Sequence, residues 1–184
     1  MNIKMNIGKS NFLDAKLETI CSNDDLRPAM QCVYFKDGYV YATDAHVAIK
    51  QHLSLHDIDE ECAKILDGKL LHKSHLQIMK KCDWFEILPN GIKSKKGMMT
   101  ITHEFYDDKY PDIEKVIPKK ANSSLNVLGL NAVLLKKVQD VMFQTEGQHL
   151  KLEFTKPNGA ILLTTMIRPE HQVGLIMPIH VTKD

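Results

Sequence analysis

The sequence contains no long hydrophobic run. Across its 184 residues, no apolar stretch approaches the ~18 residues that identify a membrane-spanning helix. The opening residues, Met-Asn-Ile-Lys-Met-Asn-Ile, also lack the apolar core of a secretion signal. With 43% hydrophobic and 26% charged residues, the composition is that of an ordinary globular protein, and we expect no membrane partner.

Cysteines are few and scattered. The four are Cys21, Cys32, Cys62 and Cys82, and none stands in the Cys-x-x-Cys spacing of a zinc or redox site. A His-Glu-x-x-His motif is absent as well. Such cysteines are expected to be reduced thiols in the cytoplasm, and the sequence predicts neither a bound metal nor another cofactor.

Neither sign of charge dominates. Lys and Arg number 24 and Asp and Glu number 23, which gives a net charge of +1. Net charge therefore neither favours nor excludes a nucleic-acid partner, and only the placement of the lysines can decide. Trp84 and Phe85 are not interleaved with basic residues, so we expect them in the core rather than stacked on bases.

Hydrophobic periodicity divides the chain into three stretches of roughly 60 residues, each with a short strand, a helix and a small antiparallel meander. Helices are predicted over residues 12–22, 73–82 and 131–142. Strands are predicted over residues 3–7, 32–36, 39–49, 84–88, 98–105, 124–128, 150–154, 161–165 and 173–179. This mixture indicates an α+β fold with the helices on one face of the sheets.

Turn signals and composition refine this division. Asp37-Gly38 between β-rich flanks predicts a type I′ hairpin, and Asn90-Gly91 predicts another tight turn. The basic residues 93–96 are interpreted as a solvated hairpin tip. The segment 119–124, Lys-Lys-Ala-Asn-Ser-Ser, is the predicted linker between a domain at residues 1–118 and an additional half-domain at residues 119–184.

The segment Tyr41-Ala-Thr-Asp44-Ala-His46-Val-Ala48 carries the most chemistry. On a strand, Asp44 and His46 would point to the same face, because side chains alternate with a period of two. The pair could supply metal ligands or an acid–base couple, with His72 and His75 as further ligands. Alternatively, Asp44 hydrogen-bonds a loop backbone and His46 packs at a strand edge. The residues alone leave both interpretations open.

Three segments occur in a suggestive order. Arg27-Pro28 and the Asp37-Gly38 hairpin lead into Ala42-Thr-Asp-Ala-His-Val-Ala48. Pro111-Asp-Ile-Glu-Lys-Val-Ile-Pro118 follows, and Ile176-Met-Pro-Ile179 comes near the end. Together they resemble the bacterial DNA sliding clamp, the β subunit of DNA polymerase III. The chain is similar to the central domain of a clamp followed by the second half of its last domain.

The resemblance implies a protein that is not an enzyme and that has a groove for peptide motifs of DNA polymerases or repair proteins. The matching positions are Thr43, Ala45, His46, Val47, Pro111, Lys115, Val116, Leu175 and Met177. Apolar residues with a few polar groups suit such a socket. Ala45 replaces the family's glycine and Val47 its arginine, so we expect a different loop path and an altered peptide preference.

The resemblance also implies that the helices face duplex DNA and bind its phosphates without sequence preference. The candidate lysines are Lys9, Lys16, Lys73, Lys80, Lys81, Lys136 and Lys137. A lysine near a helix C-terminus also interacts favourably with the helix dipole, which explains Lys80 and Lys81 equally well.

Assembly follows from the number of helix-plus-strand units. The family's rings contain about twelve units, so with about three per chain a closed ring would require about four copies. The resemblance therefore implies a homo-oligomer, with a clamp loader as a further candidate partner. A monomeric or dimeric peptide-binding adaptor that does not encircle DNA is the alternative. A small hydrolase built on Asp44 and His46 is a third hypothesis.

Overall fold

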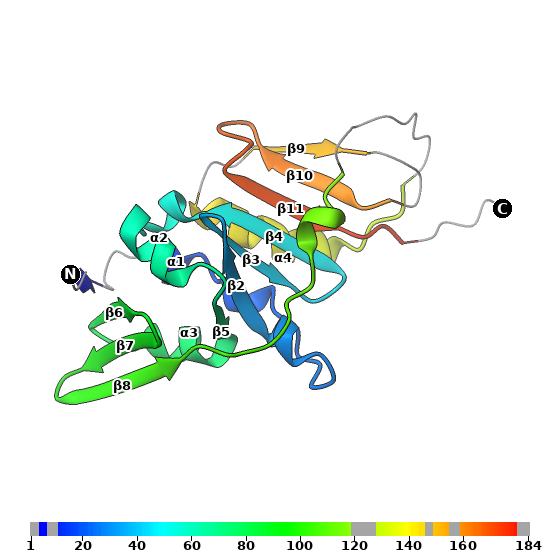
Figure 1. Ribbon diagram of the computed structural model, residues 1–184. Coiled ribbons are helices and arrows are strands. Elements are labelled where there is room, and N and C mark those ends of the chain that lie inside the picture. The colour runs from blue at the N-terminus through cyan, green and yellow to red at the C-terminus, as the bar shows by residue number, and fades with distance from the viewer. Residues whose placement is uncertain (1–3, 7–10, 119–127, 146–148, 155–158, 180–184) are drawn as a thin grey trace.

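The computed structural model describes residues 4–6, 11–118, 128–145, 149–154 and 159–179. These residues form two antiparallel sheets (Figure 1). One has four strands in the order β1-β6-β7-β8, and the other has seven in the order β5-β2-β3-β4-β11-β10-β9. Together with the short helices they confirm the predicted α+β class.

The described strands are β1 (Lys4–Asn6), β2 (Cys32–Lys36), β3 (Tyr39–Thr43), β4 (Val47–His52), β5 (Leu70–His72), β6 (Trp84–Leu88), β7 (Gly91–Lys96), β8 (Met99–Glu104), β9 (Leu150–Glu153), β10 (Ile161–Thr165) and β11 (Gln172–Ile176). Most of them lie within or overlap the predicted spans, but β5 and β7 fall outside all of these spans. The α-helices are α1 (Asn11–Asp14), α2 (Glu60–Leu66), α3 (Lys73–Met79) and α4 (Ala132–Thr145). Short 3-10 helices are η2 (Leu17–Thr19), η3 (Pro28–Gln31), η4 (Leu53–His56) and η5 (Ile113–Lys115). The predicted linker at 119–124 and most of the predicted strand at 124–128 lie outside the described residues.

The first two stretches exchange their opening strands. β1 pairs with β6 of the second stretch, and β5 pairs with β2 of the first. Each stretch then adds its own meander, β2-β3-β4 or β6-β7-β8. The repeating plan predicted from periodicity is therefore present, and the two stretches interlock.

β4 and β11 join the third stretch to the first in one continuous sheet. Their antiparallel register sets Ala48 opposite Leu175 and Gln51 opposite Gln172. Both glutamines are fully buried, and Gln51 Nε2 donates to Gln172 Oε1 over 2.7 Å. This bond favours a single register, because a one-residue slip would turn these side chains to the other face of the sheet. The sheet thus runs across the predicted domain boundary at residue 118.

The two faces of the seven-stranded sheet are covered by different segments. Along β4 the side chains alternate, so that Ile49 packs in the main core with α4 while Ala48 packs on the opposite face. α4 lies close to the sheet because Gly174 has no side chain. A Cβ at Gly174 would come within 2.5 Å of Val138 Cγ1 on α4.

The first hairpin forms as predicted, but the first helix does not. Asp37 and Gly38 have φ values of 50° and 79°, as a type I′ turn requires. Instead of one helix over residues 12–22, the chain makes the single turn α1 and then η2, after Lys16 adopts a left-handed φ of 56°. Phe12 and Leu17 are nevertheless buried. Their side chains therefore reach the core although the segment is not one continuous helix.

Two further segments differ from the prediction. Residues 93–96 lie within β7 rather than at the hairpin tip, which falls at residues 97–98, and Ser94 is fully buried. Pairing with strands on both sides overrides their weak strand propensity. α2 is not predicted by the periodicity, yet its start is marked by Asp59, whose side chain caps the helix by accepting from the Cys62 N–H over 2.8 Å.

Candidate functional site

A connector, residues 110–117, crosses the face of the seven-stranded sheet opposite α4 (Figure 1). Tyr110 is buried and stacks on Tyr34 of β2, with ring centroids 4.9 Å apart. Ile113 is buried in the same cluster as Ala48 and Leu175, which are opposite each other across β4 and β11. Apolar contacts therefore hold the connector against both halves of the sheet.

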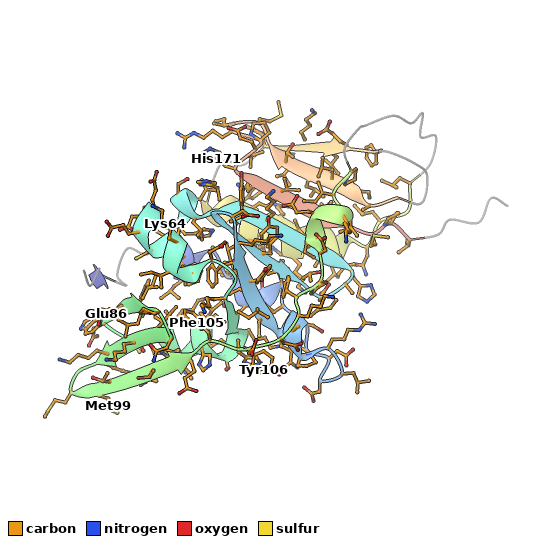
Figure 2. All side chains as sticks on the ribbon, in the orientation of Figure 1. Lys64, Glu86, Met99, Phe105, Tyr106 and His171 are labelled. Carbon is orange, nitrogen blue, oxygen red and sulfur yellow. The ribbon has the colours of Figure 1, made fainter. Side chains whose placement is uncertain are left out.

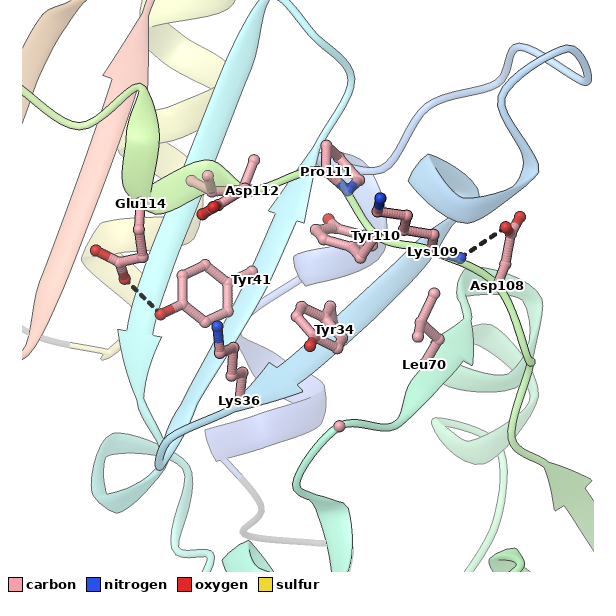
Figure 3. A pocket seen from close by; sticks show the side chains of 12 residues that line it. Tyr34, Lys36, Tyr41, Leu70, Asp108, Lys109, Tyr110, Pro111, Asp112 and Glu114 are labelled. Carbon is pink, nitrogen blue, oxygen red and sulfur yellow. Dashed lines mark hydrogen bonds between the residues drawn. The ribbon is translucent and has the colours of Figure 1, made fainter.

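Glu114 fastens the connector to the sheet (Figure 3). Its Oε1 accepts a hydrogen bond of 2.6 Å from the Tyr41 hydroxyl and lies 2.6 Å from Lys50 Nζ. Burial alone would raise the pKa of Glu114, but the bonds from Lys50 and Tyr41 outweigh it, and the pKa is lowered. Burial and the contact with Glu114 raise the pKa of Tyr41, which keeps this hydroxyl protonated as the donor.

The loop between β3 and β4, residues 44–46, is braced by the Asp44 carboxylate. Oδ1 accepts from the backbone N–H groups of His46 and Val47, each over 2.9 Å, and Oδ2 accepts from Lys137 of α4. Burial would raise the pKa of Asp44, but the Lys137 bond and the two backbone bonds lower it. The expected same-face pairing of Asp44 with His46 on a strand is wrong, because both lie in a turn. Asp44 has instead the loop-bracing role of the alternative interpretation.

Ala45 sits in this loop with a φ of 76°. The left-handed region costs an L-residue roughly 1–2 kcal/mol, which is why glycine is favoured there. Thr43 steadies the loop, since its hydroxyl donates to the Val47 carbonyl over 2.8 Å and accepts from the Ala45 N–H over 3.1 Å. The loop therefore accommodates alanine in a conformation that favours glycine.

The loop, the connector and the final strand meet. The Met177 N–H donates to the His46 carbonyl over 3.0 Å, just beyond the β4–β11 pairing. The connector reaches the same place, because its Ile113 is buried in one cluster with Ala48, which follows the loop, and Leu175, which precedes Met177. The three segments singled out from the sequence therefore share one surface, which we call the connector surface.

The predicted groove residues differ in their exposure. Exposed on the connector surface are Ala45, His46, Lys115, Val116 and Met177, with Pro111 half-buried. Thr43 and Leu175 are buried beneath them. Val47 is buried in the main core on the α4 side, so its side chain does not line this surface, contrary to expectation. Val116 and Met177, which are 56% and 44% exposed, form its apolar part.

Pockets beside the connector add residues that the sequence analysis did not assign. One of about 490 Å³ is lined by Pro111 and Lys115 together with Arg27, Pro28, Ala29, Met30, Asp108, Lys109, Tyr110 and Asp112. This wall could have been predicted from the Arg27-Pro28 dipeptide, because that dipeptide is one of the motifs on which the resemblance to clamps rests. A second pocket, of about 320 Å³, includes Tyr34, Lys36 and Tyr41 (Figure 3).

Several of the predicted DNA-facing lysines hold internal contacts. Lys73 donates to the Ser22 carbonyl and Asn23, Lys80 pairs with Glu18, and Lys137 pairs with Asp44. Lys136 is exposed and pairs with Asp140 of its own helix over 2.8 Å. Within the described ranges, Lys16 and Lys81 are exposed and make no ion pair, and Lys9 lies outside those ranges.

Three of the histidines contact other side chains. Among the described residues, no three His, Cys, Asp or Glu side chains are placed to hold an ion. His72 Nδ1 lies 2.8 Å from the Ser74 hydroxyl, and His75 contacts His103 at 3.1 Å. In this same part of the chain, no helix is both long and apolar enough to span a bilayer.

The fold built from these interlocked stretches is that of the bacterial DNA sliding clamps. No family model and no curated protein matches the sequence. Among solved structures, the β sliding clamp of Caulobacter crescentus, with polyethylene glycol bound, matches with a TM-score of 0.71 at 15% identity, over 98% of this chain and 65% of the clamp. DNA polymerase III subunit β of Borrelia burgdorferi gives 0.72 at 12%, over 99% and 63%. The clamp of Bartonella birtlesii bound to griselimycin gives 0.70 at 13%, over 98% and 66%.

These matches confirm the resemblance seen in the sequence motifs and its clamp-like fold. The chain spans about two thirds of the length of the clamps it matches. The α+β units with exchanged strands thus have the architecture of a sliding clamp, although the sequence is only 12–15% identical to these clamps.

Proposed function

We propose that this protein is a clamp-like processivity factor that catalyses nothing. It holds a peptide motif of a DNA polymerase or repair protein on the connector surface and duplex DNA, without sequence preference, against its helices. The observation that carries the proposal is the meeting of residues 43–46, 111–116 and 175–177 on one face of a clamp fold. Such a protein works by raising the effective concentration of its partner on DNA.

The chemistry of the connector surface supports a peptide partner. Val116 and Met177 offer exposed apolar area to a leucine or aromatic anchor, and a methionine adapts to several shapes. His46 and Lys115 supply exposed polar groups beside them, and the pocket at Pro111 extends the surface. A few polar groups around an apolar socket are typical of anchor recognition.

Titration calorimetry tests the peptide site. The probes are griselimycin, which the Bartonella birtlesii clamp binds, and a peptide carrying the clamp-binding motif of a DNA polymerase. The double variant His46→Ala/Met177→Ala is expected to weaken binding by roughly tenfold, about 1.4 kcal/mol. The matched control is His149→Ala/Met166→Ala, which truncates an exposed histidine and an exposed methionine elsewhere. Equal affinity of the first variant and the unmodified protein would exclude this site.

The DNA contact needs a test that leaves the fold intact. Reversing Lys73 or Lys137 would break internal contacts, so the informative lysines are the exposed Lys16, Lys81 and Lys136. Changing these three to Glu is expected to abolish duplex binding at low salt, because phosphate contacts are electrostatic. The control reverses three exposed lysines at other sites, Lys36, Lys93 and Lys109. If both triple variants bind duplex DNA equally, the helix face is not the DNA-binding face.

A second candidate is a peptide-binding adaptor that does not encircle DNA. It is favoured by the internal contacts of Lys73, Lys80 and Lys137, which leave fewer free cations near the helices than the sequence implies. A protein that binds the peptide but shows no salt-dependent duplex binding would be this adaptor. A homo-oligomer that binds both, with or without a loader, would be the processivity factor.

A further inference from the structure

The loop of residues 44–46, between β3 and β4, presents two groups on which the connector surface depends. His46 is exposed there, and its carbonyl accepts from the Met177 N–H over 3.0 Å. A shift of the loop would therefore displace both His46 and Met177. The order of the peptide site proposed above depends in this way on the order of the loop.

The backbone of this loop is strained. Ala45 has a φ of 76°, in the left-handed region that an L-residue rarely adopts. Its side chain is exposed, so burial in the core does not offset the strain. Thr43 restrains the start of the loop, because its hydroxyl accepts from the Ala45 N–H over 3.1 Å. The rest of the loop needs a restraint of its own.

Asp44 supplies that restraint. Its Oδ1 accepts from the N–H groups of His46 and Val47, each over 2.9 Å, which requires the carboxylate to be turned into the loop. Its Oδ2 pairs with Lys137 of α4, the one cation that pairs with Asp44 in the described part of the chain. Lys137 therefore neutralises the carboxylate in the orientation that braces the loop.

Lys137 is itself held in place by the packing of α4. The helix lies close to the sheet because Gly174 has no side chain, and the residue of α4 that meets Gly174 is Val138, the next in sequence. The side chains of Lys137 and Asp44 are only 24% and 16% exposed. Salt screens such a pair weakly, and removing one partner leaves the other charge without compensation.

We infer that Lys137 is a positioning residue of the peptide site. From α4 it keeps the Asp44 carboxylate turned into the loop, and through Asp44 it keeps Ala45 in its strained conformation. The inference rests on the proposed function, because the site that it concerns is the connector surface. The resemblance to clamps implies a DNA contact for Lys137, and α4 covers the face of the sheet opposite the connector (Figure 1). Lys137 thus acts on the peptide site from the other face of the sheet.

Loss of the Lys137 charge is expected to release the loop. Asp44, without its cation, would turn toward water and give up its bonds to the loop N–H groups, and Ala45 would leave the left-handed region. The displaced loop would no longer hold His46 and Met177 in place. Glycine has no such strain to release, so Ala45→Gly should make the loop less dependent on Lys137.

Titration calorimetry without DNA tests this dependence, with a peptide carrying the clamp-binding motif of a DNA polymerase. Lys137→Met keeps the length of the side chain but not its charge, and is expected to weaken peptide binding about tenfold. Lys137→Arg keeps the charge and should bind within about twofold of the unmodified protein, because a guanidinium also pairs with a carboxylate. Ala45→Gly/Lys137→Met should recover most of the affinity that Lys137→Met loses.

Two variants serve as controls. Lys64→Met removes the charge of an exposed lysine of α2 (Figure 2), and Glu18→Gln removes the partly buried ion pair with Lys80. Both should leave the peptide affinity unchanged, and urea midpoints check that every variant is folded. Equal affinity of Lys137→Met and the unmodified protein, or failure of Ala45→Gly to recover binding, would overturn the inference.

Hydrogen exchange in the protein without peptide separates this inference from the proposed function. In Lys137→Met the N–H groups of His46 and Val47 should exchange about tenfold faster, while that of Ile49 within β4 should not change. Unchanged exchange at the loop would overturn the inference whether or not the peptide binds. An unmodified protein that binds no peptide would instead contradict the proposed function.

Discussion

β4 and β8 are the same strand of two equivalent meanders, but among the described residues only β4 pairs with a further strand, β11, on its outer edge. Val47 at the start of β4 is 2% exposed, whereas Met99 at the start of β8 is 61% exposed. Both residues are apolar and occupy the same position of their meanders. The difference comes from β11 and α4, which cover β4. The burial of these first residues is therefore decided by the strand and helix that pack on β4 and not by the type of residue alone.

The fifth residue of both β4 and β8 is a buried polar residue, and the two find their hydrogen-bond partners differently. In β4 it is Gln51, which bonds Gln172 on the neighbouring strand. In β8 it is His103, which lies 2.7 Å from the Ser94 hydroxyl of β7 and 3.1 Å from His75 of α3. The buried polar group of β4 therefore bonds a residue of the neighbouring strand β11. That of β8 finds its partners within its own stretch, so β8 does not need a further strand in order to fold.

The largest expected effect comes from disturbing the cover of β4. Gly174→Ala places a Cβ 2.5 Å from Val138 Cγ1 and should destabilise the protein by about 1–3 kcal/mol through overpacking. Urea denaturation measures the loss. Adding Val138→Ala removes the clashing atom, so the double variant should be more stable than the sum of the single changes predicts. Strict additivity would show that α4 is not held by this close approach.

The second effect concerns His103 of β8. Burial, with His75 nearby, lowers the pKa of His103 to about 4, against 6.5 ordinarily. Between these values the unfolded chain binds a proton that the folded chain does not, so stability falls as pH drops from about 6.5 toward 4. His103→Gln should reduce this slope of urea midpoint against pH. Equal slopes in His103→Gln and the unmodified protein would contradict the assignment.

The third effect concerns the outer faces of the two meanders. Tyr41 on β3 is covered by the connector, while its equivalent on β7, Lys93, is exposed. Tyr41→Phe removes the 2.6 Å bond to Glu114 and should cost about 1 kcal/mol in urea denaturation. Tyr39→Phe is the control, because in the described part of the chain its hydroxyl makes no side-chain hydrogen bond. Loss of stability in both variants alike would mean that the bond does not anchor the connector.

The smallest effect concerns the turns that precede β4 and β8. Gly97 has a φ of 56° in one, and Ala45 has a φ of 76° in the other. Ala45→Gly should stabilise the protein by less than about 1 kcal/mol, because relief of backbone strain exceeds the added entropy of the unfolded glycine. Thermal unfolding measures this gain. A lower melting temperature would show that the alanine side chain contributes contacts that offset its strain.

Local features of the fold could be predicted from the sequence. The Asp37-Gly38 turn and the strand Ile161–Thr165 depend on residues close in the chain, and both form as predicted. The exchange of β1 and β5 could not be predicted, because alternation shows that a strand is half-buried without naming its neighbour. For the same reason β7 was not predicted: its basic residues locally favour a turn, but pairing with β6 and β8 holds them in a strand.

The candidate site was predictable in its segments but not in every residue. The resemblance selected the loop, the connector and the final strand, and these three meet in the structure. It could not show that Val47 faces α4, since that depends on where β4 begins after the loop. Nor could it show that Lys137 bonds Asp44, because α4 and the loop are distant in sequence.

The exchanged opening strands also constrain the order in which the chain can fold during its synthesis. Lys4 of β1 pairs with Glu86 of β6, so β1 has no partner strand until β6, about eighty residues further along the chain, has been made. The first meander can form earlier, but its flanking strand β5 also comes from the later stretch. We therefore expect residues 1–118 to mature in a single step late in synthesis, with pairings of high sequence separation limiting the rate.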